Sequence, residues 1–199
     1  LGFSWMGEDV RPFTGPEELV EVLGHFLEGA QQDAVCLVQE RIEDVVCEVR
    51  FVCCQDLARG PEAVTKELVW MKLHPPRHSD ETFSLTSHQT MGPQEAIDYA
   101  FSGSKGALEA AEKKATELAE LWLQWFRQEG HGTPAACRLD FLVAVPAACR
   151  GRPEAEVWTV ELCECGGSLC GMQPQGRAVA CLNACLAGGA SSQPPLPLP

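Results

Sequence analysis

The sequence predicts an α+β domain, an antiparallel sheet with flanking helices. Two segments with apolar residues at helical spacing, 14–29 and 106–127, alternate with segments rich in β-branched and aromatic residues. Short polar connections join these segments, as is typical of antiparallel neighbours. The 199 residues are 45% hydrophobic with a mean hydropathy of −0.08, enough for one substantial core. We expect one domain over residues 1–187 and a disordered, Pro-rich tail over 188–199.

The first predicted helix begins after Thr14 and ends near Gly29. Pro16 stands in its first turn, where the missing backbone N–H costs nothing. Glu17 and Glu18 follow, and acidic side chains stabilise the N-terminal end of a helix dipole. One apolar face recurs at helical spacing and consists of Leu19, Val22, Leu23, Phe26 and Leu27.

Three strands are expected next, over residues 34–42, 47–54 and 67–73. Apolar, β-branched and aromatic residues dominate them, and the last two show the alternation of half-buried strands. Residues 75–104 are rich in Pro, His, Ser, Thr and Gly. They predict a long surface loop with a short turn of helix over 93–99.

A long helix over 106–127 precedes two further strands, over 137–145 and 157–165. Its apolar stripe consists of Leu108, Ala111, Ala115, Leu118, Trp122 and Phe126. We expect this stripe to pack against the sheet and to serve stability. The two strands are expected to pair antiparallel, and a short apolar helix over 177–186 ends the predicted domain.

Asp140 and Glu161 lie inside these two apolar strands. A buried carboxylate without a partner is costly, so each needs a neutralising group. Arg138 is on the same face as Asp140, because side chains two residues apart in a strand point the same way. Two hypotheses remain open: the carboxylates hold a divalent cation, or they form structural salt bridges with arginine.

Several short segments follow one another along the chain in the order found in a known fold. They are Gln-Glu-Arg-Ile at 39–42, Glu-Val-Arg-Phe at 48–51, a strand bearing Lys72, the long helix, Arg-Leu-Asp-Phe-Leu-Val at 138–143 and Val-Glu-Leu-Cys at 160–163. In this order, residues 10–187 resemble the C-terminal half of the ATP-grasp fold, nearest to its D-alanine ligase-like and tubulin-tyrosine-ligase-like branches. The resemblance implies a domain that binds ATP with Mg²⁺, with ATP-dependent carboxylate–amine ligation as the implied activity.

The resemblance also implies which residues contact the nucleotide. The segment that matches the hinge around the adenine edge is Gln39, Glu40, Arg41 and Ile42. Glu48 or Arg50 matches residues that face the ribose or the triphosphate. Lys72, in an otherwise apolar strand, is a candidate phosphate contact; an exposed strand position explains it equally well.

For catalysis, Arg138 matches the arginine that contacts the transferred phosphate, and Asp140 and Glu161 match the carboxylates that bind Mg²⁺. Carboxylates can face a triphosphate only through hard cations. In such enzymes an acyl phosphate forms and an amine then attacks it. Cys163 stands where the family's E-x-N pattern carries Asn, and a thiol is a soft ligand poorly suited to Mg²⁺. The family's N-terminal subdomain is expected upstream of Leu1 or is absent.

The charge balance excludes some partners. With 15 Lys+Arg against 28 Asp+Glu, the net charge of −13 repels phosphate backbones and anionic lipid, so we expect neither nucleic acid nor membrane as a partner. No apolar run approaches the roughly 18 residues of a membrane span, and no signal peptide pattern opens the chain. A cytoplasmic protein is expected, whose partners are a nucleotide and a protein partner or upstream domain.

Eleven cysteines leave two alternatives to a nucleotide site. The densest set is Cys163, Cys165, Cys170, Cys181 and Cys185. Its spacing is not that of paired zinc knuckles, but a zinc-stabilised interaction domain stays open as a hypothesis. The other alternative is a non-catalytic scaffold that retains the fold, favoured by the substitution at Cys163. Most thiols are expected to be reduced.

Overall fold

The computed structural model describes part of the chain, namely residues 12–28, 38, 40–73 and 89–164. The chain divides into two compact units, Leu1–Ile42 and Glu43–Pro199, which we describe separately. The predicted helix over 177–186 and the predicted tail over 188–199 lie outside the described residues.

The described part of the first unit is one helix and two short stretches. Helix α1 (Pro16–Leu27) confirms the predicted helix and carries Glu17 and Glu18 in its first turn. Gly15 precedes it with φ 87°, a left-handed conformation that costs glycine little. Of the strand predicted over 34–42, Val38 and residues 40–42 have no regular secondary structure, and the other positions lie outside the described residues.

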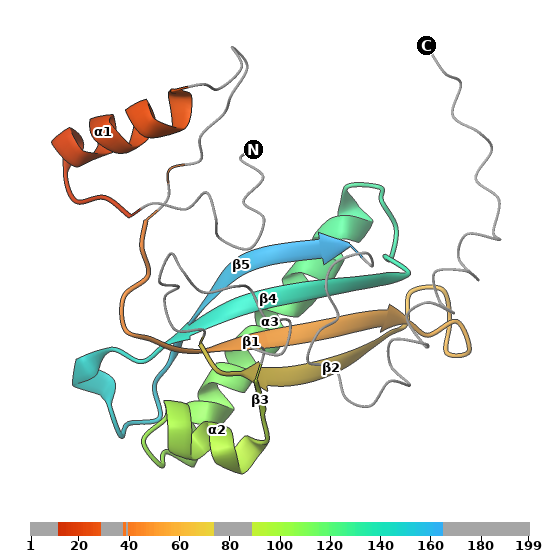
Figure 1. Ribbon diagram of the computed structural model, residues 1–199. Coiled ribbons are helices and arrows are strands. Elements are labelled where there is room, and N and C mark those ends of the chain that lie inside the picture. The colour runs from red at the N-terminus through yellow and green to blue at the C-terminus, as the bar shows by residue number, and fades with distance from the viewer. Residues whose placement is uncertain (1–11, 29–37, 39, 74–88, 165–199) are drawn as a thin grey trace, which may run out of the picture. The chain divides into compact units, whose positions relative to one another are not determined.

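The second unit is built on a five-stranded antiparallel sheet (Figure 1). Its elements are β1 (Val45–Gln55), β2 (Val64–Met71), β3 (Thr90–Met91), α2 (Pro93–Ala100), α3 (Lys105–Gln128), β4 (Ala136–Ala144), the 3₁₀ turn η2 (Ala147–Cys149) and β5 (Glu156–Glu164). The strands lie in the order β3-β2-β1-β4-β5, and every neighbouring pair is antiparallel. The predicted α+β class with an antiparallel sheet is confirmed.

Strands β1, β4 and β5 match the predicted ranges within two residues at each end, and two other strands differ more. Strand β2 begins and ends earlier than the predicted range 67–73. Strand β3 was not predicted, because two residues within a Ser/Thr-rich segment carry no periodic signal. The helix predicted over 93–99 is α2, which places Ala96, Ile97 and Ala100 in the core.

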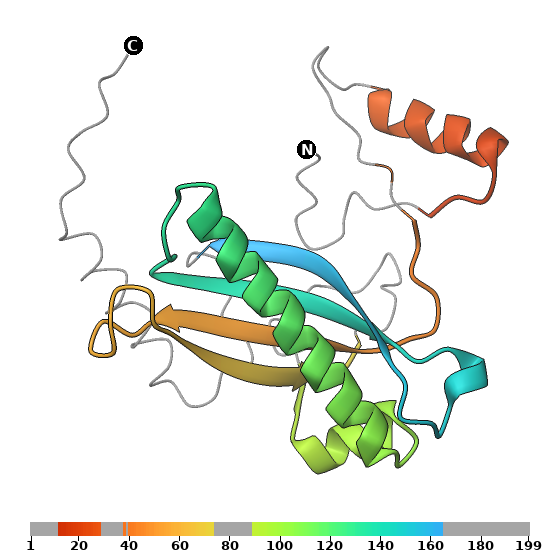
Figure 2. The same ribbon diagram turned by 180° about the vertical axis from the view of Figure 1, so that it is seen from behind.

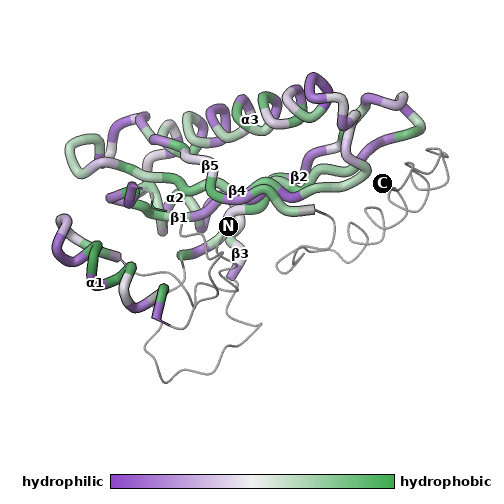
Figure 3. The backbone as a smooth tube through the Cα atoms, turned by 90° about the horizontal axis from the view of Figure 1, so that it is seen from above, coloured by the Kyte–Doolittle hydropathy of each residue, from purple (hydrophilic) through white to green (hydrophobic). Residues whose placement is uncertain are grey.

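Helix α3 covers one face of the sheet (Figures 2 and 3). Ser104 caps its N-terminus, with its hydroxyl oxygen accepting from the Ala107 amide at 3.2 Å. The buried row of the helix is rich in alanine and consists of Ala107, Leu108, Ala111, Ala115, Ala119 and Leu123. Small side chains let the helix approach the strands closely. No helix in the described part of the chain is long and apolar enough to cross a membrane.

The buried row differs in part from the predicted stripe. Leu118 and Trp122 are only partly buried, while Ala119 and Leu123 take the fully buried positions. The indole N–H of Trp122 donates to the Thr159 hydroxyl of β5 at 3.1 Å, so this tryptophan lies where the helix meets the edge strand. Helix α3 thus packs on the sheet as predicted, with a contact line shifted by one residue.

The two faces of the sheet differ in composition because β1 and β4 alternate. On the α3 face, Val49 and Phe51 of β1 lie opposite Phe141 and Leu139 of β4, all buried in one hydrophobic core. The rings of Phe51 and Phe141 meet edge to face, with centroids 6.1 Å apart. The intervening residues point to the other face, where the candidate site lies.

Candidate functional site

A cluster of charged residues lies on the face of the sheet opposite α3. The charged cluster consists of Glu48 and Arg50 of β1, Arg138 and Asp140 of β4, and Glu161 of β5, with Cys163 beside them. Arg50, Asp140 and Glu161 are register partners across three neighbouring strands. Directly opposite residues share a face, so the sheet itself brings these side chains together.

The predicted division of β4 and β5 between the two faces is confirmed. Arg138, Asp140 and Glu161 share one face. Leu139 and Phe141 belong to the core on the α3 face, and Leu162 packs against it. Period-two alternation requires this division once the register is set. The hairpin's inserted segment between Ala144 and Glu156 does not disturb the pairing.

Asp140 is the centre of the charged cluster. Arg50 donates to both carboxylate oxygens of Asp140, from Nε to Oδ1 and from Nη2 to Oδ2, each at 3.0 Å. Arg138 donates from Nε to both carboxylate oxygens, at 3.0 and 3.1 Å. All three residues are buried: Arg50 is 4% exposed, Arg138 5% and Asp140 3%. Paired, charge-assisted contacts of this kind offset the cost of burying three charges.

Arg138 links Asp140 to β5. Its Nη2 donates to Glu161 Oε2 at 2.9 Å and to Cys163 Sγ at 3.1 Å, and it lies 3.0 Å from Asp140 Oδ2. Bonds of 3.0 and 2.9 Å meet at one nitrogen, so the two carboxylate oxygens lie no more than 5.9 Å apart. One divalent cation can contact both carboxylates only if Arg138 moves aside and the two side chains draw closer, because cation–oxygen distances are about 2.0–2.6 Å.

Burial raises the pKa of two members of the cluster. Burial and the nearby charge of Asp140 raise the pKa of Glu48, although Glu48 also bonds Arg50 Nη2 at 3.1 Å. Burial raises the pKa of the Cys163 thiol to about 12. Cys163 is therefore a neutral thiol at pH 7, which makes it a still weaker ligand for a hard cation.

The donor atoms fit a magnesium ion only in part. Glu161, with 55% of its side chain exposed, can offer a carboxylate to a cation, and Asp140 can do so if it gives up an arginine. Cys163 supplies no hard ligand in place of the asparagine that the resemblance implies. Within the described residues, no three His, Cys, Asp or Glu side chains are arranged to hold a metal ion, because Arg138 stands between the two carboxylates.

The structure places Lys72 apart from the charged cluster. Lys72 follows β2, and its ammonium pairs with Glu95 of α2 at 2.6 Å and lies 5.5 Å from the centre of the Tyr99 ring. Trp70, two residues earlier, belongs to the core on the α3 face, so alternation directs Lys72 to the same side. Lys72 therefore lies on the other face of the sheet from Arg50, and its role as a phosphate contact stays a prediction.

The predicted adenine hinge is described only in part. Gln39 lies outside the described residues. Glu40, Arg41 and Ile42 belong to the first unit and have no regular secondary structure. Their role in reading adenine stays a prediction.

The cysteines of the described part do not form a zinc site. Cys54 is disulfide-bonded, an exception to the expected reduced state. The free thiols are Cys47, Cys53, Cys137, Cys149 and Cys163. Four members of the set considered for zinc, Cys165, Cys170, Cys181 and Cys185, lie outside the described residues. The zinc hypothesis therefore stays a prediction.

Sequence reasoning named every member of the charged cluster and included salt bridges between the carboxylates and arginine as one hypothesis, but it did not identify Arg50 as a partner of Asp140. The resemblance implied that Glu48 or Arg50 faces the ribose or the triphosphate, whereas the main partner of Arg50 in the structure is Asp140, 90 residues away. One signal was present: Arg50 stands between Val49 and Phe51 in a strand whose following residues are all apolar to Cys54. An arginine in such a run needs a buried anion.

The chain was compared with protein-family models, with curated proteins and with solved structures. None of the three comparisons finds a match, so the charged cluster has to be interpreted from its own chemistry.

Proposed function

We propose that the charged face of this sheet is the phosphate end of a nucleotide site, in a divergent ATP-grasp module that binds ATP with Mg²⁺. The observation that carries the proposal is the placement of two arginines and two carboxylates on three adjacent strands, with Arg138 contacting both carboxylates. Arginines suit phosphate oxygens, and carboxylates suit the cation that accompanies them. The spacing and order of the ATP-grasp-like segments support the same assignment.

In this proposal the residues have separate tasks. Arg138 and Arg50 take phosphate oxygens, with Arg138 at the transferred phosphate. Asp140 and Glu161 then face Mg²⁺, which neutralises the triphosphate and positions it. Access is from the β5 side, where Glu161 is exposed while Arg50, Arg138 and Asp140 are buried. The role of Gln39 to Ile42 at the adenine stays a prediction, and a further domain or a protein partner would complete the cleft.

The cluster favours binding over rapid turnover. A ligand has to replace Asp140 as the partner of two buried arginines, and this exchange costs affinity. Cys163 leaves the cation one hard ligand short. We therefore propose carboxylate–amine ligation only together with an N-terminal ATP-grasp subdomain.

A second function is favoured by the same pairing. Because Asp140 already has arginine partners on both sides, the cluster can serve as a fixed structural network in a non-catalytic interaction scaffold. In that case the charges fix the register of β1, β4 and β5 and need no ligand.

Calorimetric titration of MgATP into the full chain separates the two functions. The proposal predicts that Asp140→Asn and Glu161→Gln each lose most of the binding heat, since each removes a cation ligand. Asp98→Asn, an exposed carboxylate on α2, is the matched control and keeps it. Equal heats for all four proteins, or none for any, would leave the scaffold as the surviving function.

A further inference from the structure

Strand β5 forms one edge of the sheet and carries an exposed row of alternating character. Glu156, Trp158 and Glu161 are opposite Ala144, Leu142 and Asp140 of β4, so all three point to the face away from α3. Trp158 is 44% exposed and the side chain of Glu161 is 55% exposed. An edge strand directs every second pair of its backbone N–H and C=O groups outward, where another strand can pair with them.

The register of β5 shifts at Val160. Asp140 is opposite Glu161 while Phe141 is opposite Thr159, so Val160 is an extra residue, and it is 55% exposed. A bulge interrupts pairing on the outer edge. An added strand therefore has its regular partners in residues 156–159, with Glu161 flanking it.

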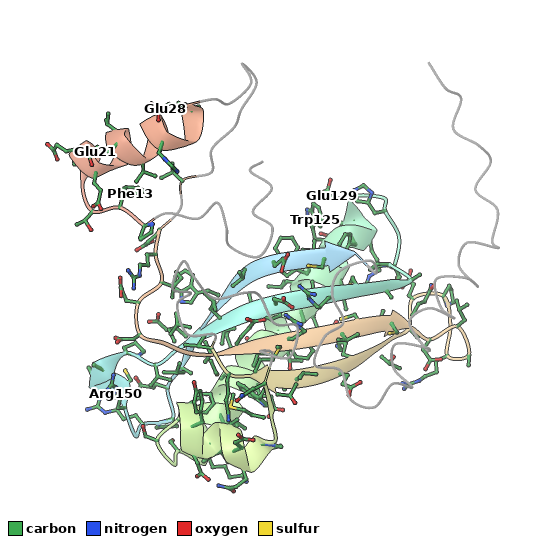
Figure 4. All side chains as sticks on the ribbon, in the orientation of Figure 1. Phe13, Glu21, Glu28, Trp125, Glu129 and Arg150 are labelled. Atoms are coloured by element: carbon green, nitrogen blue, oxygen red, sulfur yellow. The ribbon has the colours of Figure 1, made fainter. Side chains whose placement is uncertain are left out.

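A groove between α3 and β5 leaves room for the side chains that point from such a strand toward α3. It has a volume of about 510 Å³ and is lined by Ala110, Lys113, Lys114 and Glu117 of α3 and by Ala155, Glu156, Val157 and Trp158. Lys114 lies 3.9 Å from Glu117, and the lining includes two lysines and two glutamates, so the groove itself selects neither sign of charge. Further along α3, Leu121 and Trp125 are exposed apolar residues, and Trp125 lies near the C-terminal end of the helix (Figure 4).

The helix and the strand are held in place beside each other. Trp122 of α3 donates to Thr159 of β5, and the Trp122 and Trp125 rings meet edge to face at 5.7 Å. The groove is therefore present before a partner binds, and the cost of ordering it on binding is small.

Charge decides what kind of strand this edge accepts. A second copy of this chain would bring its own β5 glutamates to the same edge, along with a net charge of −13. Like charges repel, so this pairing is disfavoured. A basic strand has the opposite effect, because Lys or Arg placed across from Glu156 and near Glu161 forms cross-strand ion pairs. An apolar residue between the two basic ones covers the exposed face of Trp158.

We propose that β5 binds an extended basic segment of a partner protein, added to the sheet as a sixth strand beside Glu156 to Thr159. The segment has a basic residue, an apolar residue and a second basic residue at alternate positions. Its remaining side chains enter the groove between α3 and β5. The proposal does not rest on nucleotide binding, although Glu161 belongs to both surfaces.

The test uses a labelled nine-residue peptide with lysines two positions before and after a central phenylalanine. Fluorescence anisotropy with the full chain is expected to show binding that weakens about tenfold in Glu156→Lys and in Trp158→Ala. N-methylation of the peptide backbone at alternate residues should abolish binding, since it removes the strand hydrogen bonds. Asp98→Lys, a charge reversal on α2, which contacts β3 at the other edge of the sheet, should bind the peptide normally.

Three results would overturn the proposal. The first is equal affinity for a peptide in which glutamates replace the lysines. The second is binding that is absent or indifferent to Glu156→Lys. The third is a dimer in sedimentation experiments that Glu156→Lys dissociates, because β5 would then pair with a second copy.

Discussion

The two faces of the sheet are made from the same strands but carry opposite kinds of residue. In β1, Val49 and Phe51 face α3 and are buried among apolar side chains, while Glu48 and Arg50 face the other way. Helix α3 fixes the first face through close apolar packing, and the second face is held by directed charge pairs. One face can therefore account for stability, and the other is available for chemistry.

The largest expected effect is on the apolar face. Phe141 has no exposed surface, and Phe141→Ala should lower the free energy of unfolding by about 3–5 kcal/mol. Urea denaturation followed by circular dichroism measures this loss. Val160→Ala, at an exposed position of β5, is the control and should change stability little. A small loss for Phe141→Ala would show that the core is not centred on α3.

On the charged face, the loss of stability should be large when one partner of the charge pairs is removed. It should be small when all three charges are removed together. Asp140→Ala leaves two buried arginines without this carboxylate and should cost about 3–5 kcal/mol. Replacing Arg50 and Arg138 by Met and Asp140 by Leu at once should be nearly neutral, or stabilise by about 1–4 kcal/mol. A triple variant that unfolds would mean that the charge pairs are needed for the fold, which would erase the contrast between the faces.

A smaller effect is expected where α3 meets the edge strand. Trp122 is partly buried and donates to Thr159, so Trp122→Ala should cost about 2 kcal/mol, less than a fully buried tryptophan. Thr159→Val removes the hydrogen bond alone and should cost about 1 kcal/mol. Thermal denaturation of both variants measures the two contributions, and a loss above about 4 kcal/mol for Trp122→Ala would show deeper burial.

The smallest effect is a dependence of stability on pH. Burial raises the pKa of Glu48 in the folded protein above 4.5, so between 4.5 and the raised value the folded protein binds more protons than the unfolded one. Stability therefore falls as pH rises through this window. Glu48→Gln should flatten this fall, while Glu109→Gln, an exposed residue of α3, should not. Urea denaturation across this range tests the sign, and a steeper fall in Glu48→Gln would contradict it.

Much of this architecture could be predicted because its signals are local. Helical spacing located α1 and α3, a short turn of helix was expected where α2 forms, and period-two alternation placed Arg138 and Asp140 on one face. The two residues of β3 are too few to show a period. The buried row of α3 includes Leu123 rather than Trp122. The alanines of this row let the helix pack more closely on the sheet than a stripe of large residues would.

What could not be predicted depends on contacts distant in sequence. Lys72 pairs with Glu95 and lies near Tyr99, and nothing in its own strand indicates that α2 folds against it. The salt bridge between Arg50 and Asp140 forms only because β1 and β4 are neighbours in a particular register. Strand order and register follow from the assembled sheet, not from the pattern of one strand.

The most direct test of the MgATP site is the change Cys163→Asn. It places an amide oxygen beside Glu161, where the thiol with a pKa of about 12 is a poor ligand for Mg²⁺. Calorimetric titration of Cys163→Asn and of the unaltered chain with ATP, each with and without Mg²⁺, compares the two ligands at one position. If Asp140, Glu161 and position 163 surround the cation, Cys163→Asn binds MgATP about tenfold more tightly and metal-free ATP no better. Unchanged affinity for MgATP, or an equal gain without Mg²⁺, would contradict a magnesium site on this face.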